Sequence, residues 1–148
     1  MASKVTIFIA EDDPLMARLY EKAFRLSGYE INLAFDGEEA IKKIEELREN
    51  KPTIIILDIM MPKLSGFDVL KFLKQEKDFK NIPVVVLTNL AGKEDAEKAL
   101  SMGAVLYLVK SQYDPKQVVE KIKEIISGYS RGSNIPDVKV GVKDIKEK

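Results

Sequence analysis

The chain has 148 residues, of which 45% are hydrophobic and 32% charged, so its length and composition fit one domain with its own buried core. Lysine and arginine together number 24, as do aspartate and glutamate, so bulk charge supplies no nucleic-acid-binding surface. Cysteine and histidine are absent, which excludes a disulfide framework, a thiolate metal site and imidazole chemistry.

Strand and helix patterns alternate from the start of the chain. Val5–Ala10 is a short apolar run that ends in acids, which predicts a strand. Pro14 suits the first turn of a following helix, and Gly28 is a typical stop signal. The apolar stripe predicted for this helix comprises Leu15, Met16, Leu19, Ala23 and Leu26. Ile31–Phe35 is predicted to be the second strand.

The middle of the chain continues the alternation. Asp36 is predicted to cap a helix that runs to about Arg48. The apolar stripe of that helix is Ala40, Ile41, Ile44 and Leu47. Thr53–Leu57 is a nearly continuous β-branched run, which is typical of a strand buried on both faces. Pro62 and Gly66 precede the third predicted helix. Its apolar residues are Phe67, Leu70 and Leu73.

Two more strands and a helix follow. Val84–Leu87 is another buried apolar run, and a helix is predicted near Lys93–Met102, where Gly103 ends it. Val105–Val109 is predicted to be the fifth strand.

The last predicted helix begins at the pair Asp114 and Pro115, which form a cap and a first turn, and is closed by Gly128. Its apolar residues are Val118, Val119, Ile122, Ile125 and Ile126. Five strands alternating with five helices imply a parallel sheet covered on both faces. We therefore expect an α/β fold of the flavodoxin-like (βα)5 type, a three-layer sandwich, with the strand order 2-1-3-4-5 taken from that fold.

Chemically distinctive residues follow four of the predicted strands. Glu11 and Asp12 follow the first strand, Asp58 the third, Thr88 the fourth and Lys110 the fifth. Ligands bind outside the carboxyl ends of strands in such sheets, so we expect these side chains to share one pocket. Acids from two strand ends suit Mg²⁺, and a hydroxyl with an ammonium suits a phosphoryl group.

Each of these residues also has an ordinary structural interpretation. The acids, together with Asp13, can cap the helix after Pro14, and Asp58 can form a turn. Thr88 can cap the next helix, and most lysines are solvated. Their joint placement at equivalent strand ends is what favours a pocket.

The stretches IAEDDP, ILDIMMPKLSG, VVVLTNLAG and YLVK resemble the receiver domain of two-component response regulators, the family that includes the small chemotaxis response regulator. The resemblance covers about Lys4–Gly128. It implies that Asp58 is the phosphoacceptor for a sensor histidine kinase or phosphotransfer protein. It also implies that Asp12 binds Mg²⁺ directly, that Glu11 binds it through a water, and that the Met60 carbonyl is a further ligand.

The resemblance also implies a switch. Lys110 would neutralise phosphoryl charge, Thr88 would be drawn to a phosphoryl oxygen, and Tyr107 would turn from outward to inward. The output face would be the fourth helix, fifth strand and fifth helix, which would bind a downstream protein. Such a domain is a signalling phosphoacceptor rather than an enzyme. Both a monomer and a phosphorylation-dependent dimer remain open.

The chain departs from the family pattern beside the pocket. Ser111 replaces the usual proline after the lysine, and a cis Lys110–Ser111 bond would cost about 2.5–4 kcal/mol. Asn89 replaces a small residue and would narrow access to the acyl phosphate. Met60 and Leu90 are apolar, and we expect them to exclude water and slow self-dephosphorylation.

Other functional classes fit less well. A haloacid-dehalogenase-like phosphatase needs a second aspartate where this chain has Met60. A flavodoxin-like FMN carrier needs a hydroxyl- and glycine-rich loop after the first strand, and this loop is acidic. A degenerate receiver that binds partners without phosphorylation is the main alternative, although such modules tend to lose the aspartate, the acid pair or the lysine.

The expected receiver domain spans residues 1–128, and residues 129–148 are expected to be disordered or to form a short docking segment. That tail is too short for an output domain, so we expect a stand-alone receiver or one excised from a longer protein. No run approaches the roughly 18 apolar residues that span a bilayer, and the first ten residues lack a signal-peptide cleavage site. The expected location is the cytoplasm.

Overall fold

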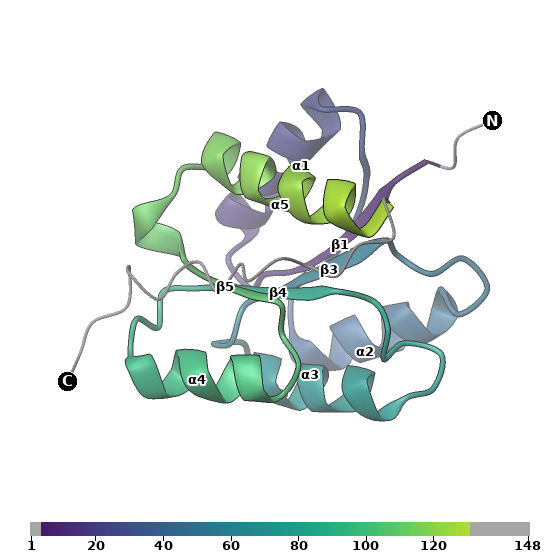
Figure 1. Ribbon diagram of the computed structural model, residues 1–148, viewed down its shortest axis with the longest axis vertical. Coiled ribbons are helices and arrows are strands. Elements are labelled where there is room, and N and C mark those ends of the chain that lie inside the picture. Colours follow the sequence, from purple (N-terminus) through teal and green to yellow (C-terminus); the bar gives the residue numbers. More distant parts are fainter. Residues whose placement is uncertain (1–3, 131–148) are drawn as a thin grey trace.

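The computed structural model describes residues 4–130. Its centre is a parallel five-stranded sheet in the order β2-β1-β3-β4-β5 (Figure 1). The strands are β1 (Thr6–Ala10), β2 (Glu30–Ala34), β3 (Ile54–Leu57), β4 (Val84–Thr88) and β5 (Leu106–Val109). Strand order and direction agree with the prediction, so the flavodoxin-like α/β fold is confirmed.

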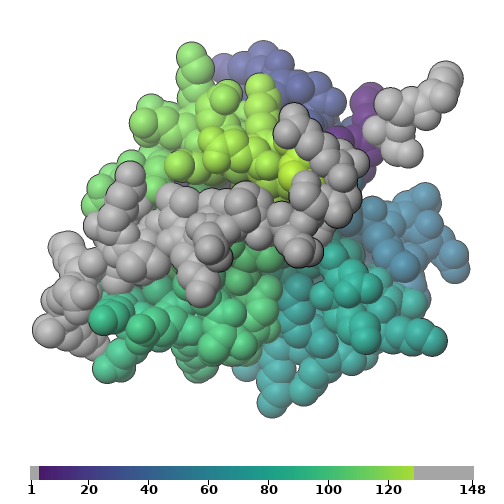
Figure 2. All heavy atoms as spheres, viewed as in Figure 1, coloured from purple at the N-terminus to yellow at the C-terminus, as the bar shows by residue number. Residues whose placement is uncertain are grey.

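Helices cover both faces of the sheet. On one face lie α1 (Pro14–Leu26) and α5 (Pro115–Ser130), which Figure 2 shows side by side in blue-purple and yellow-green. The other face carries α2 (Gly37–Glu46), α3 (Gly66–Gln75) and α4 (Lys93–Ser101) (Figure 1). The strands supply both cores by alternation: Ile7 and Ile9 pack in the α1 and α5 layer, and Phe8 and Ala10 in the opposite layer.

Side-chain caps fix where several helices begin. Asp13 accepts hydrogen bonds from the backbone N–H groups of Leu15 and Met16, and Asp36 accepts one from Glu39. Asp114 Oδ1 accepts a hydrogen bond from the Gln117 backbone N–H at 2.8 Å. The starts predicted at Asp36 and at Asp114–Pro115 are therefore correct.

The buried face of α1 differs from the predicted stripe. Leu15, Leu19 and Leu26 are 68%, 41% and 80% exposed, whereas Met16 and Ala23 of the same predicted stripe are half-buried and pack against the core. The buried residues of α1 are Ala17, Tyr20 and Phe24. Both sets recur at helical spacing, but the set that contains the Tyr20 and Phe24 rings fills the space between α1, β2 and α5. The leucines are therefore left on the outer surface of the helix.

The carboxyl end of α5 also differs from the prediction. The helix continues through Gly128 to Ser130, the last residue that the structure describes, because an interior glycine costs a helix only about 1 kcal/mol and does not by itself end it. The predicted tail lies outside the described residues from position 131 onward. Among residues 4–130, no helix is both long enough and apolar enough to cross a membrane.

Candidate functional site

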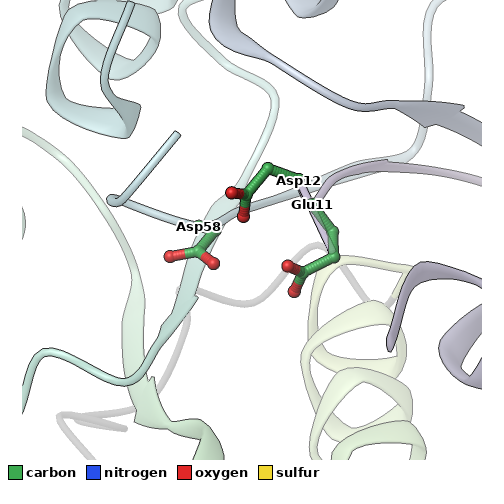
Figure 3. Close-up of side chains that lie close together, drawn as sticks. All are labelled: Glu11, Asp12 and Asp58. Atoms are coloured by element: carbon green, nitrogen blue, oxygen red, sulfur yellow. The ribbon is translucent and has the colours of Figure 1, made fainter. Parts of the chain in front are cut away.

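Three carboxylates meet at the carboxyl edge of the sheet. Glu11 and Asp12 follow β1, and Asp58 follows β3, which is hydrogen-bonded to β1. The Asp58 backbone N–H donates to the Ala10 carbonyl at 3.0 Å, which extends this pairing to the acids. One carboxylate oxygen from each acid lies within 4.8 Å of the others (Figure 3). The predicted clustering of Glu11, Asp12 and Asp58 is therefore present.

Lys110 joins two of these acids. Its Nζ lies 2.5 Å from Glu11 Oε1 and 2.6 Å from Asp58 Oδ2, and its side chain is only 10% exposed. Burial disfavours the ammonium, but hydrogen bonds to Asp58 and Glu11 outweigh it and raise the pKa of Lys110. The lysine therefore stays charged and compensates one of the buried negative charges.

Glu11 is the most deeply placed of the three acids. It is 2% exposed, and burial raises its pKa despite the opposing effect of Lys110. Its other oxygen, Oε2, accepts the Asp13 backbone N–H at 3.1 Å. Asp12 is more exposed than either Glu11 or Asp58.

The backbone around Asp58 is held closely. Asp58 Oδ1 accepts the Met60 backbone N–H at 3.1 Å. The Gly66 backbone N–H donates to the Ile59 carbonyl at 2.9 Å, and a Cβ on Gly66 would overlap the Asp58 carbonyl oxygen. Glycine at position 66 therefore lets α3 begin directly against the residue that follows β3.

Thr88 and Tyr107 lie on β4 and β5 and are fully buried. Thr88 Oγ1 accepts the Leu90 backbone N–H at 3.4 Å, and the Tyr107 hydroxyl donates to the Leu90 carbonyl at 2.7 Å. Tyr107 thus already points inward in this structure. Burial raises the pKa of Tyr107 above its usual value, so its hydroxyl remains a donor.

The residues that depart from the family pattern follow the strands whose carboxyl ends form the site. Met60 is 58% exposed, Leu90 is half-buried and Asn89 is exposed. Within residues 4–130 every peptide bond is trans, the Lys110–Ser111 bond included. Lys110 opens a short 3-10 turn, Lys110–Gln112, that was not predicted.

The donor set fits a hard divalent cation. Three carboxylates from neighbouring strand ends converge, and the Lys110 ammonium lies between two of them. Oxygen ligands in this arrangement suit Mg²⁺.

Tyr20 was not predicted as part of this region. It lies on the buried face of α1 and is 1% exposed. The charges of Lys110, Glu11 and Asp58 all act on its hydroxyl. The spacing of Ala17, Tyr20 and Phe24 was available in the sequence, but the leucines of the same helix formed a more apolar stripe.

The sequence profile described as "Response regulator receiver domain" matches residues 7–123. The polar-differentiation response regulator DivK of Brucella anthropi is 33% identical over 121 residues, which cover 82% of this chain and 95% of DivK. The alkaline phosphatase synthesis transcriptional regulatory protein PhoP of Bacillus subtilis is 36% identical over 120 residues, covering 81% of this chain and 48% of PhoP. The chain spans about half the length of the transcriptional regulators that it matches.

Solved structures of response regulators have the same fold as this chain. A CheY-like response regulator receiver domain protein from Methanospirillum hungatei has a TM-score of 0.78 at 25% identity, covering 88% of this chain and 100% of that chain. A chain of the CheX–CheY–BeF3–Mg²⁺ complex from Borrelia burgdorferi has a TM-score of 0.75 at 27% identity, covering 82% of this chain and 88% of that chain.

Proposed function

The chain belongs to the response regulator receiver domain family of two-component signalling, and on that premise we propose that it accepts a phosphoryl group on Asp58. The single observation that supports this most strongly is the position of Asp58 Oδ2, 2.6 Å from the Lys110 ammonium and beside two further acids. A carboxylate in that setting is a nucleophile next to a fixed positive charge.

In the proposed transfer, an Asp58 oxygen forms a bond to phosphorus while the bond from phosphorus to the donor nitrogen breaks. The donor keeps the electron pair of that bond, and Asp58 becomes an acyl phosphate. Lys110 neutralises charge on the phosphoryl oxygens. No proton acceptor is needed on the protein, which is consistent with a chain that has no histidine.

Asp12, Asp58 and the Met60 carbonyl would hold Mg²⁺ directly, and Glu11 would hold it through a water. Bound there, the cation would add positive charge beside the phosphoryl oxygens. The complex from Borrelia burgdorferi, which contains BeF3 and Mg²⁺, supports this assignment by analogy.

We further propose that Thr88 and Tyr107 carry the switch. Both side chains bond the backbone of Leu90, so a pull on Thr88 by a phosphoryl oxygen would reach the loop that Tyr107 holds. Tyr107 already points inward, so phosphorylation would raise the population of the inward conformation rather than create that conformation. The output face would comprise α4, β5 and α5.

The partners would be a sensor histidine kinase or phosphotransfer protein and a downstream protein on that face. Receiver domains are signalling phosphoacceptors rather than classical enzymes. The proposed location is the cytoplasm, and the chain would act as a monomer or as a phosphorylation-dependent dimer.

Intact mass after incubation with Mg²⁺ and acetyl phosphate tests the proposed function. We expect a single phosphoryl adduct that disappears without Mg²⁺ and in Asp58→Asn. Asp114→Asn, which changes an exposed acid that caps α5 and leaves an oxygen that can still accept the cap hydrogen bond, is the matched control and should keep the adduct. An absent adduct, together with no response to beryllofluoride, would favour the degenerate, phosphorylation-independent module.

A further inference from the structure

Tyr20 places its hydroxyl in the protein interior, where polar groups are normally hydrogen-bonded. Its side chain is 1% exposed, yet among the described residues its Oη has no hydrogen-bond partner. Buried hydroxyls in proteins nearly always have a partner. A phenylalanine would fill the same space without this cost, so the hydroxyl itself requires an explanation.

The direction of the helix relates Tyr20 to the acidic pocket. Side chains on a helix lean toward its N-terminus, and α1 begins at Pro14, directly after the acids that follow β1. The charges of Lys110, Glu11 and Asp58 act on the phenol. Burial raises the pKa of Tyr20 to about 12, so the group is a neutral donor near pH 7.

Glu11 is the acceptor that stands to lose a partner. Its Oε2 is held by the Asp13 backbone N–H, whereas its Oε1 is held by Lys110. In the proposed function Lys110 turns to the phosphoryl group on Asp58. Glu11 Oε1, on a side chain that is 2% exposed, would then lose its charged partner, and the metal-bound water of the proposed function would supply only one donor in its place.

We propose that Tyr20 is a positioning residue whose hydroxyl donates to Glu11, directly or through one water, when Lys110 moves to the phosphoryl group. The inference rests on the proposed function, since it needs Lys110 to move. Tyr20 would keep Glu11 oriented toward the cation and make the departure of Lys110 less costly.

Tyr20→Phe tests the inference, with Tyr29→Phe as its matched control. Tyr29 follows the carboxyl end of α1, at the opposite end of that helix from the pocket. Its substitution removes the same hydroxyl group. Urea unfolding is measured with and without Mg²⁺ and beryllofluoride. Without ligands we expect Tyr20→Phe to be as stable as the wild type or more stable. With them we expect about two- to tenfold weaker beryllofluoride binding, the range for one hydrogen bond.

If Tyr20 had only a structural role, Tyr20→Phe would change the free energy of unfolding equally with and without the ligands. That result would overturn the inference. Wild-type protein labelled with ¹³Cζ-tyrosine gives a second measurement that needs no variant to fold. The Tyr20 resonance should move on adding Mg²⁺ and beryllofluoride, and a resonance that stays fixed would also overturn the inference. If the wild type itself does not respond to beryllofluoride, the proposed function fails instead.

Discussion

Lys110 is the residue on which the charge balance of the pocket depends. Its ammonium contacts Glu11 and Asp58, which are 2% and 4% exposed. We expect Lys110→Met to lower the free energy of unfolding at pH 7 by about 3 kcal/mol, because removing one partner leaves buried charge uncompensated. Urea unfolding measures this loss. Lys42→Met, at an exposed position on α2, should change it little.

The pH dependence of that loss has a definite sign. Burial raises the pKa of Glu11 above its usual value of 4.5, so the folded state binds more protons than the unfolded state above that pH. Stability therefore falls as pH rises through the raised pKa. Removing the ammonium raises that pKa further, so the deficit of Lys110→Met should narrow as pH falls from 7 toward 5. A deficit independent of pH would contradict this explanation.

Met60 is expected to control the lifetime of the acyl phosphate. Its side chain is 58% exposed, and its backbone N–H bonds Asp58 Oδ1. We expect Met60→Asn to admit and orient water and to speed loss of the phosphoryl group about three- to tenfold, which corresponds to about 0.6–1.4 kcal/mol of barrier. Decay of the adduct is followed by intact mass. Met60→Leu should retain the wild-type lifetime, and equal decay in all three proteins would exclude this role.

The pocket residues could be predicted because strand ends are easy to locate. A buried β-branched run that stops at an acid or a lysine places that residue at the carboxyl edge of the sheet, and Glu11, Asp58 and Lys110 all lie there. The ion pairs could not be predicted. They depend on the conformations of side chains from strands that are far apart in the sequence. The inward position of Tyr107 depends on such a contact too.

At the scale of elements, α1 shows what periodicity leaves undecided. Its leucines and its Ala17, Tyr20 and Phe24 set both recur at helical spacing. Which set faces the sheet depends on the shape of the space between α1, β2 and α5, where aromatic rings pack. The position of the helix in the chain was therefore predictable, whereas its orientation about its own axis was predicted only in part, through Met16 and Ala23.

The start of α3 is the element boundary that most constrains Asp58. A Cβ at Gly66 would overlap the Asp58 carbonyl oxygen and approach the Ile59 backbone, which cannot move as a flexible side chain can. We expect Gly66→Ala to lower the free energy of unfolding by about 3 kcal/mol and to slow phosphorylation of Asp58 by acetyl phosphate. Urea unfolding and the rate of adduct formation measure the two effects.

Gly128→Ala is the matched control for this change. Gly128 lies within α5, and a Cβ there would meet no atom within 4 Å. The substitution should stabilise the protein by up to about 1 kcal/mol through helix propensity alone. If both alanine variants were equally stable, close packing at Gly66 would not be what positions the backbone after β3.

At the scale of the whole molecule, the sheet gathers more negative than positive charge at one edge. Glu11, Asp12 and Asp58 lie within 4.8 Å of one another, and Lys110 compensates one of them. Like charges at this separation repel each other, and the metal-free fold must hold them together. The fold therefore keeps a site that is destabilising by itself, and we expect a bound cation to offset that cost.

Asp12→Asn separates these two effects. Because it removes one of the repelling charges, we expect the metal-free protein to become more stable by about 0.5–1 kcal/mol. Wild-type protein should gain about 2.7 kcal/mol at a Mg²⁺ concentration one hundred times its Kd, and the variant should lose most of that gain. Thermal unfolding with EDTA and with Mg²⁺ measures both, with Glu46→Gln as an exposed charge-loss control. Equal Mg²⁺ stabilisation of variant and wild type would place the cation elsewhere.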